Sequence, residues 1–241
     1  MRNLILLPAI FIGTFSFASA CDHVKGTGEV VKKVVSVENF HGITVEGAID
    51  VVLTQSATRS VEVEAQANIG ELLTTEVRNG VWIIGTGDKN YSTDKTFTVH
   101  ISVPTIDMVS IEGSGDVKGN GIFAADNVDL DILGSGNITL AFTAKTIKAD
   151  IQGSGDMKLS GTCATFKAEV EGSGDISANG LVSANVNVSV EGSGDVALVA
   201  NESLEASVAG SGDVTYKGHP SRISRDVSGS GEIRSIETLA R

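Results

Sequence analysis

The chain has 241 residues, of which 41% are hydrophobic but only 5% aromatic, and it contains 28 glycines and 3 prolines. Its core must therefore be built from Val, Ile, Leu and Ala, a mixture that suits strands and fits poorly with a helical bundle. The formal net charge of −12 argues against nucleic acid and anionic membrane surfaces as partners, because both attract basic proteins. Cationic partners and divalent metal ions are compatible with this charge.

Residues 1–20 have the pattern of a signal peptide. Arg2 supplies a positive charge, residues 4–17 form an apolar run, and Ala18-Ser19-Ala20 matches a signal-peptidase site. The run is too short, and wrongly flanked, for a transmembrane helix. We therefore expect an exported protein that is periplasmic, anchored to a membrane of the cell envelope, or displayed at the cell surface.

Cys21 stands where a bacterial lipoprotein carries its acylated cysteine. Two interpretations stay open: Cys21 carries a lipid anchor, or the chain is cleaved there and the cysteine is incidental. The only other cysteine is Cys163, which is expected to be a small buried residue if Cys21 is acylated. A Cys21–Cys163 disulfide is the alternative. Residues 21–37, with Gly26 and Gly28, are expected to be a tether.

The strongest signal in the sequence is an internal repeat. Gly-Ser-Gly followed by an acidic or amide residue occurs seven times, at intervals of 21, 19, 19, 20, 18 and 19 residues. Glycines are needed at a corner where the backbone takes a positive φ, or where neighbouring segments approach too closely for a Cβ atom. The predicted structural corner residues are Gly113, Gly115, Gly134, Gly136, Gly153, Gly155, Gly172, Gly174, Gly192, Gly194, Gly210, Gly212, Gly229 and Gly231.

Apolar and polar residues alternate on both sides of each corner, as in Ile151 before Gly153 and Met157 after it. Alternation with period two is typical of half-buried strands. A repeat of about 19 residues cannot close a core by itself, so its coils must stack on one another. We expect an all-β parallel β-helix, a solenoid with three short strands and three corners per coil, whose coils are about 4.8 Å apart.

Residues 38–241 are expected to form this β-helix domain, with regular repeats from about residue 107. The N-terminal coils follow a less regular rhythm and are expected to cap one end of the stack. Residues 45–51 resemble residues 111–117, though less strictly. Trp82, the only tryptophan, is expected to anchor the core of this region.

Several short motifs accompany the repeated Gly-Ser-Gly-Asp: Phe40-His41-Gly42-Ile43, Gly47-Ala48-Ile49-Asp50-Val51 and Val103-Pro104. Through these motifs, roughly residues 38–220 resemble the bacterial "putative auto-transporter adhesin, head GIN domain" family. The resemblance implies a right-handed β-helix similar to pectin-lyase-type folds, with no catalytic residues kept. It also implies a role in adhesion, and it supplies no functional residues to carry over.

The residue after each Gly-Ser-Gly would form a column in the stack. Neighbouring carboxylates about 4.8 Å apart repel by about 1 kcal/mol in water. Three interpretations stay open: acceptors for turn amides, a row of weak Ca²⁺ sites, and a lyase-like acid cluster. The candidate metal ligands are Asp116, Asp156, Asp175, Asp195 and Asp213, and no other cofactor is indicated.

No catalytic constellation is evident, so we expect that the chain is not an enzyme. The histidines are not in metal-binding spacing, and no nucleophile elbow, P-loop or zinc-type cysteine pair occurs. The favoured function is a non-enzymatic cell-envelope protein for binding or adhesion, with a glycan, another protein or a second copy of the chain as partner. The alternatives are a polysaccharide-active or vestigial pectin-lyase-like enzyme and a purely structural envelope lipoprotein.

Overall fold

The computed structural model describes residues 23–236. The predicted signal peptide (residues 1–20) and Cys21 therefore lie outside the described residues. About 67% of the described chain is strand, and none of its helices is long or apolar enough to cross a membrane.

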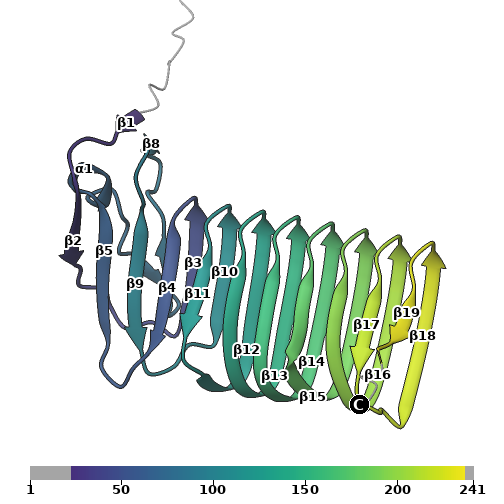
Figure 1. The fold of residues 1–241 in the computed structure, drawn as a ribbon. Coiled ribbons are helices and arrows are strands. Elements are labelled where there is room, and N and C mark those ends of the chain that lie inside the picture. Colours follow the sequence, from purple (N-terminus) through teal and green to yellow (C-terminus); the bar gives the residue numbers. More distant parts are fainter. Residues whose placement is uncertain (1–22, 237–241) are drawn as a thin grey trace, which may run out of the picture.

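From Met108 onward the chain winds into a column of stacked coils (Figure 1). Strands of successive coils pair in parallel, and each corner glycine lies beside the corner glycine of the next coil. The column confirms the predicted β-solenoid, with about seven turns about 19 residues apart. Its strands are β10 (Met108–Gly113), β11 (Val117–Asn120), β12 (Phe123–Gly134), β13 (Ile138–Gly153), β14 (Met157–Gly172), β15 (Ile176–Gly192), β16 (Val196–Gly210), β17 (Val214–Lys217), β18 (Arg222–Gly229) and β19 (Ile233–Ser235).

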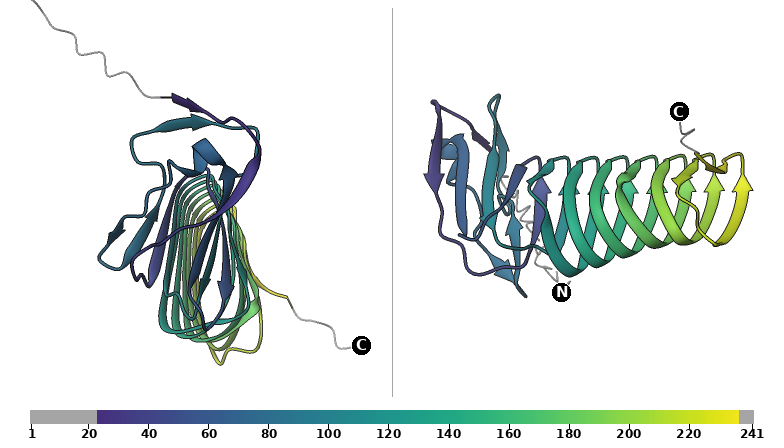
Figure 2. Two further views of the ribbon diagram at one scale, coloured as in Figure 1. Left: turned by 90° about the vertical axis from the view of Figure 1, so that its left-hand side faces the viewer. Right: turned by 60° about the horizontal axis from the view of Figure 1, so that its bottom comes forward.

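Each coil has two long sides. Strands β13, β14 and β15 run for 16, 16 and 17 residues from one corner to the next, and the coils are narrow and elongated when seen end on (Figure 2). The prediction of three short strands and three corners per coil is therefore wrong. A sharp Gly-Ser-Gly corner and a gentler bend within the long strand close the coil, and at this bend the ladder between β13 and β14 skips Lys145.

The bend lies where the alternation of buried side chains changes phase. In β13 the even-numbered residues of 138–142 are buried before the bend, and the odd-numbered residues of 147–151 are buried after it. A 19-residue coil needs such a change, because every inward position must stack on an inward position of the next coil. The coil from Gly192 to Gly210 has 18 residues, and its buried positions keep one phase from Val196 to Val208.

Two glycines at each corner allow one coil to lie directly on the next. Gly153 has a φ of +138°, and a Cβ atom on it would lie 2.3 Å from the carbonyl oxygen of Gly134 in the preceding coil. A Cβ atom on Gly155 would lie 2.0 Å from the carbonyl oxygen of Gly136. No side chain fits at such distances, and the corner glycines of the other coils meet the preceding corner in the same way.

One further coil precedes β10. It consists of β3 (Gly42–Gly47) and β4 (Asp50–Gln55), which pair in parallel with β10 and β11. Its corner lies in register with the corner at Gly113, so the weaker motif found by sequence marks a true coil. Ile49 takes the place of the second glycine here, and its side chain is buried in the core with 1% exposed.

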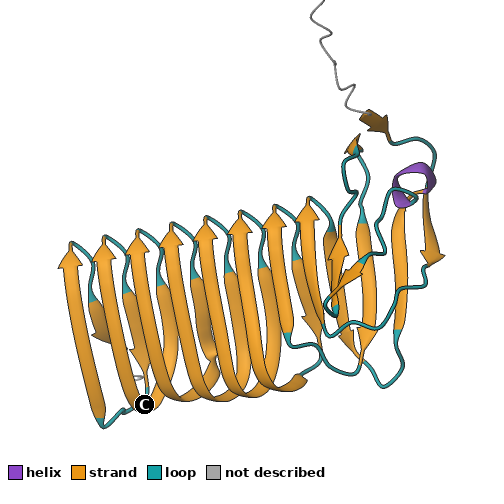
Figure 3. Cartoon of the chain, turned by 180° about the vertical axis from the view of Figure 1, so that it is seen from behind, coloured by secondary structure: helices purple, strands orange, loops and turns teal. Residues whose placement is uncertain are grey.

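An irregular cap covers the N-terminal end of the column, and it contains the single helix of the described chain (Figure 3). Strand β9 pairs with β4 in parallel, β5 pairs with β9 antiparallel, and β2 pairs with β5 antiparallel. Residues 23–34, which the sequence assigned to a tether, thus contain two strands. The cap elements are β1 (His23–Lys25), β2 (Val30–Val34), β5 (Ser60–Gln66), α1 (Ala67–Gly70), β6 (Val77–Arg78), β7 (Val81–Ile84), β8 (Asn90–Ser92) and β9 (Thr98–Val103).

Trp82 on β7 is the core anchor of this region, as the sequence predicted. Its side chain is fully buried, and its Nε1 atom donates a hydrogen bond to the carbonyl of Thr74 at 3.0 Å. The C-terminal end has no such cover within the described residues. Strand β18 pairs only with β16, and Ile223 and Val227 at its inward positions are 46% and 43% exposed.

The corner geometry predicts that Gly155→Ala lowers the melting temperature strongly. The new Cβ atom would push the corner away from the carbonyl of Gly136, with an expected loss of about 3 kcal/mol in the free energy of unfolding. Ser154→Ala is the matched control, because Ser154 is exposed at the same corner, and it should cost less than about 0.5 kcal/mol. Thermal unfolding followed by circular dichroism compares the two, and equal losses would contradict the stacking requirement.

Candidate functional site

The residue after each corner forms a continuous column along one edge of the solenoid. The side-chain Oδ1 atom of this residue accepts a hydrogen bond from the backbone N–H of the equivalent residue in the next coil, at 2.8–3.2 Å. Sequence reasoning missed Asp50, which begins the column because its corner stacks on the next one. The members are Asp50, Asp116, Asn137, Asp156, Asp175, Asp195, Asp213 and Glu232.

Backbone groups connect the same corners. The carbonyl of Asp175 accepts from the N–H of Met157 in the preceding coil at 2.8 Å, and the N–H of Ser173 donates to the carbonyl of Gly153 at 2.9 Å. The column residue therefore bonds to its neighbours through its side chain, its N–H and its carbonyl. This is the geometry expected if the carboxylates serve as acceptors for turn amides.

Asp116 is bonded most extensively among the column residues. Its carboxylate accepts from Asn137 Nδ2 at 2.8 Å and from Lys118 Nζ at 3.1 Å. Burial acts to raise the pKa of Asp116, but these donors and the Lys118 charge outweigh it and hold the pKa below the usual 3.8. The resulting stabilisation is complete well above pH 3.8 and is lost as the pH falls through the lower folded-state pKa.

The column does not gather a conventional metal centre. Residues 23–236 contain no group of three His, Cys, Asp or Glu side chains that could hold a metal ion. In each predicted ligand, one carboxylate oxygen already accepts a hydrogen bond from a backbone N–H. Ca²⁺ binding by Asp116, Asp156, Asp175, Asp195 and Asp213 stays a prediction of the sequence.

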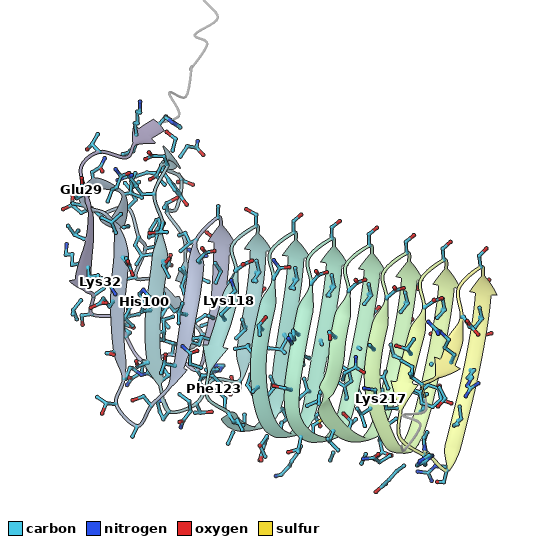
Figure 4. All side chains as sticks on the ribbon, viewed as in Figure 1. Glu29, Lys32, His100, Lys118, Phe123 and Lys217 are labelled. Carbon is cyan, nitrogen blue, oxygen red and sulfur yellow. The ribbon has the colours of Figure 1, made fainter. Side chains whose placement is uncertain are left out.

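The histidines and Cys163 lie apart from the row of residues that follow the corners. His41 Nδ1 is 2.6 Å from Asp107, and this hydrogen bond raises the pKa of His41. Lys32 and His100 both contact Glu64 on the outer surface of the cap (Figure 4). Cys163 is buried, which raises the pKa of its thiol, and its Sγ atom lies 3.3 Å from a serine hydroxyl. The thiol therefore has a serine, and no histidine base, as its hydrogen-bond partner.

One long side of the column, formed by β3, β10, β12–β16 and β18, is strongly acidic; we call it the acidic side. Parallel pairing aligns its outward residues in columns, and the basic residues in these columns are Lys148, Lys167 and Arg222. The repeat alignment contained this signal, but sequence reasoning treated these positions only as polar. Its acidic residues are Glu46, Glu112, Asp129, Asp131, Asp150, Glu169, Glu171, Glu191, Glu205 and Asp226.

A hollow of about 580 Å³ lies beside the corner of the first coil; we call it the first-corner hollow. Its walls are Gly47 and Ala48 on one side and the segment around β8 on the other, including Lys89 and Tyr91. Sequence reasoning missed this site, because no motif marks it. The hollow exists because the coil of β3 and β4 is the first of the stack, so no further corner lies on the outer side of its corner.

The family described as "Putative auto-transporter adhesin, head GIN domain" matches residues 39–220. The chain belongs to this family. The resemblance inferred from the motifs is therefore confirmed. No curated protein sequence matches the chain.

Solved structures with the same fold include proteins named as adhesins. A "putative adhesin" from Bacteroides fragilis has a TM-score of 0.82 and 27% identity, covering 88% of this chain and 100% of its own. A "putative adhesin" from Parabacteroides distasonis has a TM-score of 0.72 and 26% identity, covering 89% and 100%. A "putative lipid binding protein" from the same species has a TM-score of 0.72 and 22% identity, covering 90% and 100%. The family description and the two structures above 25% identity carry adhesin names.

The ladder predicts that Asp175→Asn is tolerated, because an amide oxygen can still accept the N–H of the next coil, as Asn137 does in the native chain. Asp175→Ala removes the acceptor and should lower the free energy of unfolding by about 1–2 kcal/mol. Chemical denaturation of both variants measures the difference. Equal destabilisation by Asn and Ala would show that the charge, and not the acceptor, matters at this position.

Asp131 on the acidic side is expected to differ from Asp175, because its replacement should stabilise the protein. Burial, followed by the charge of Asp150, raises the pKa of Asp131 above its usual value, so the fold disfavours its charged form. Asp131→Asn should therefore stabilise the protein at pH 7 by about 0.5 kcal/mol, a small value because the group is half-exposed. The gain should vanish well below pH 3.8, where Asp131 is protonated and therefore as neutral as the asparagine that replaces it. Melting temperatures at both pH values test this, with Asp226→Asn as control, because Asp226 is exposed on the same side and does not act on Asp131. A gain that persists in acid would contradict the prediction.

Proposed function

We propose that this GIN-domain protein is a non-enzymatic binding protein of the cell envelope, in which the rigid column presents its long sides to a partner. The supporting observation is the repetition itself, because the same outward positions recur on every coil and form an extended regular surface. Membership of a family named for adhesion agrees with this use. The acidic side favours a glycan or protein partner whose contacting surface is cationic.

The arrangement of polar groups favours binding over catalysis. A sugar-cleaving site needs an acid pair at the cleaved bond. Here the column residues accept backbone hydrogen bonds. His41 is paired with Asp107 just before the first strands of the stacked coils, and His100 is paired with Glu64 in the cap. A polysaccharide-active or vestigial enzyme is therefore the weaker alternative, and a purely structural spacer is a second one.

Binding of a lipid inside the column is also disfavoured. The relative named as a lipid-binding protein is 22% identical, so its likeness supports the fold alone. The interior of this column is filled by side chains: Phe123 and Phe142 are fully buried, with ring centroids 6.0 Å apart, and Phe166 is buried in the next coil. The partner is therefore expected on the surface.

A binding screen tests the proposal. The purified chain from residue 22 onward contains every described residue, and it should bind at least one member of a panel of envelope glycans and extracellular proteins saturably. Binding should weaken at high salt if the acidic side takes part. The same preparation should release no products from polygalacturonate. Turnover of a polysaccharide, or a complete lack of binding partners across the panel, would contradict the proposal.

We also propose that Cys21 carries the lipid that holds the protein to a membrane. Cys21→Ser should then move the protein from the membrane fraction to the soluble fraction of an expressing bacterium, because acylation requires the thiol. Cys163→Ser is the matched control, since Cys163 is buried in the column, and it should leave the fractionation unchanged. Retention of the Cys21→Ser variant in the membrane fraction would reject the anchor.

A further inference from the structure

The first coil ends the corner ladder with an unused donor. In each later coil, the serine N–H donates to the carbonyl of the first corner glycine in the preceding coil, at 2.8–2.9 Å. Ala48 occupies the serine position in the first coil. Among residues 23–236, no group accepts a hydrogen bond from its N–H. In each of the later coils, a peptide carbonyl accepts from the N–H at this position. An amide oxygen is therefore the acceptor that matches the N–H of Ala48.

The space for that oxygen is open. A Cβ atom on Gly113 would lie 2.3 Å from the carbonyl oxygen of Gly47, but a Cβ atom on Gly47 would meet nothing within 4 Å. Gly47 and Ala48 are both exposed. The missing corner is thus part of the first-corner hollow of about 580 Å³, a size typical of small-molecule sites, which span about 300–1,000 Å³.

Tyr91 supplies an aromatic wall to the hollow. Its ring packs edge-on against the buried Phe97, with centroids 5.6 Å apart, so the ring is held in place while it lines the hollow. A tyrosine hydroxyl is protonated at neutral pH and can donate a hydrogen bond. Burial, and next the charge of Asp50, raise the pKa of Tyr91 further above that range.

The charges around the hollow balance. Lys89 and Lys95 line it together with Glu46, and Asp50 lies close enough to act on Tyr91. Lys95 also faces Asp94 at 3.9 Å. A strongly charged ligand would be repelled by one set of these groups, whereas a neutral ligand rich in hydroxyl groups can use both the ammonium donors and the carboxylate acceptors.

We propose that the first-corner hollow binds a neutral saccharide that carries an acetamido group. The acetamido carbonyl accepts from the N–H of Ala48, in the place that a glycine carbonyl takes in the other coils. A sugar ring lies against the exposed part of Tyr91, because amphipathic rings pack well on aromatic side chains. The inference rests on the proposed binding function and adds to it a second site, apart from the acidic side, with its own ligand class.

Titration with two matched trisaccharides tests the assignment on the chain from residue 22 onward, ¹⁵N-labelled for nuclear magnetic resonance. Triacetylchitotriose, called chitotriose below, has an acetamido group on each ring, and cellotriose has a hydroxyl group in its place. We expect chitotriose to shift the amide signals of Ala48 and Tyr91 saturably and cellotriose to bind at least about tenfold more weakly. Equal affinity for both sugars, or binding that leaves these two signals unmoved, would overturn the proposal.

Two variants separate the contacts. Ala48→Pro removes the N–H, while Ala48→Ser keeps it and restores the residue found at the other corners; the first should weaken chitotriose binding about tenfold and the second should not. If Ala48→Pro fails to fold, Tyr91→Ala tests the same site and should weaken binding by a similar factor. Unchanged affinity in Tyr91→Ala would overturn the proposal.

The outcomes distinguish this inference from the proposed function. If chitotriose does not bind although the chain binds another panel member, the assignment of the hollow is wrong and the binding function stands. Binding of an N-acetylated Gly-Ser-Gly peptide in the hollow without chitotriose binding would likewise overturn the saccharide assignment. If no panel member binds, both proposals fail.

Discussion

The stacking of one corner on the next is the contact on which the whole column depends. At each corner the backbone of a coil lies directly against the carbonyl of the preceding coil, which only glycine permits. That approach brings the serine N–H and the acidic N–H within bonding distance of acceptors in the preceding coil. Register is then fixed at every turn, and the apolar columns of successive coils must coincide.

This constraint separates the parts of the chain that fix the fold from the parts free to serve function. Corner glycines, column acceptors and inward apolar residues recur in every coil, whereas outward residues change from Lys148 and Lys167 to Asn187 and Glu205 at one position. The long sides therefore form a rigid surface with a variable pattern, which suits binding. The raised pKa of Asp131 indicates that the acidic side is not optimised for stability.

Much of the column could be predicted because its physics is local and repeated. The corner spacing and the alternation predicted the parallel stack and the acidic column. The alternation of apolar residues changes phase between residues 142 and 147, but this change was not used. Three short strands were therefore expected instead of one long strand with a bend. The cap could not be derived, since the antiparallel pairings of β2, β5 and β9 join distant segments without a repeat. The first-corner hollow could not be derived either, because it results from a missing coil.

Amide hydrogen exchange of the native protein tests the corner contacts most directly. If stacked corners hold the column together, the amides of Ser173, Asp175 and their equivalents should be protected as strongly as those of the buried strands, since each donates to the preceding coil. The amide of Ala48, which has no acceptor among the described residues, should exchange rapidly. Rapid exchange at the Ser173 and Asp175 positions, with protection confined to the strands, would show that the corners are not the contact on which the fold depends.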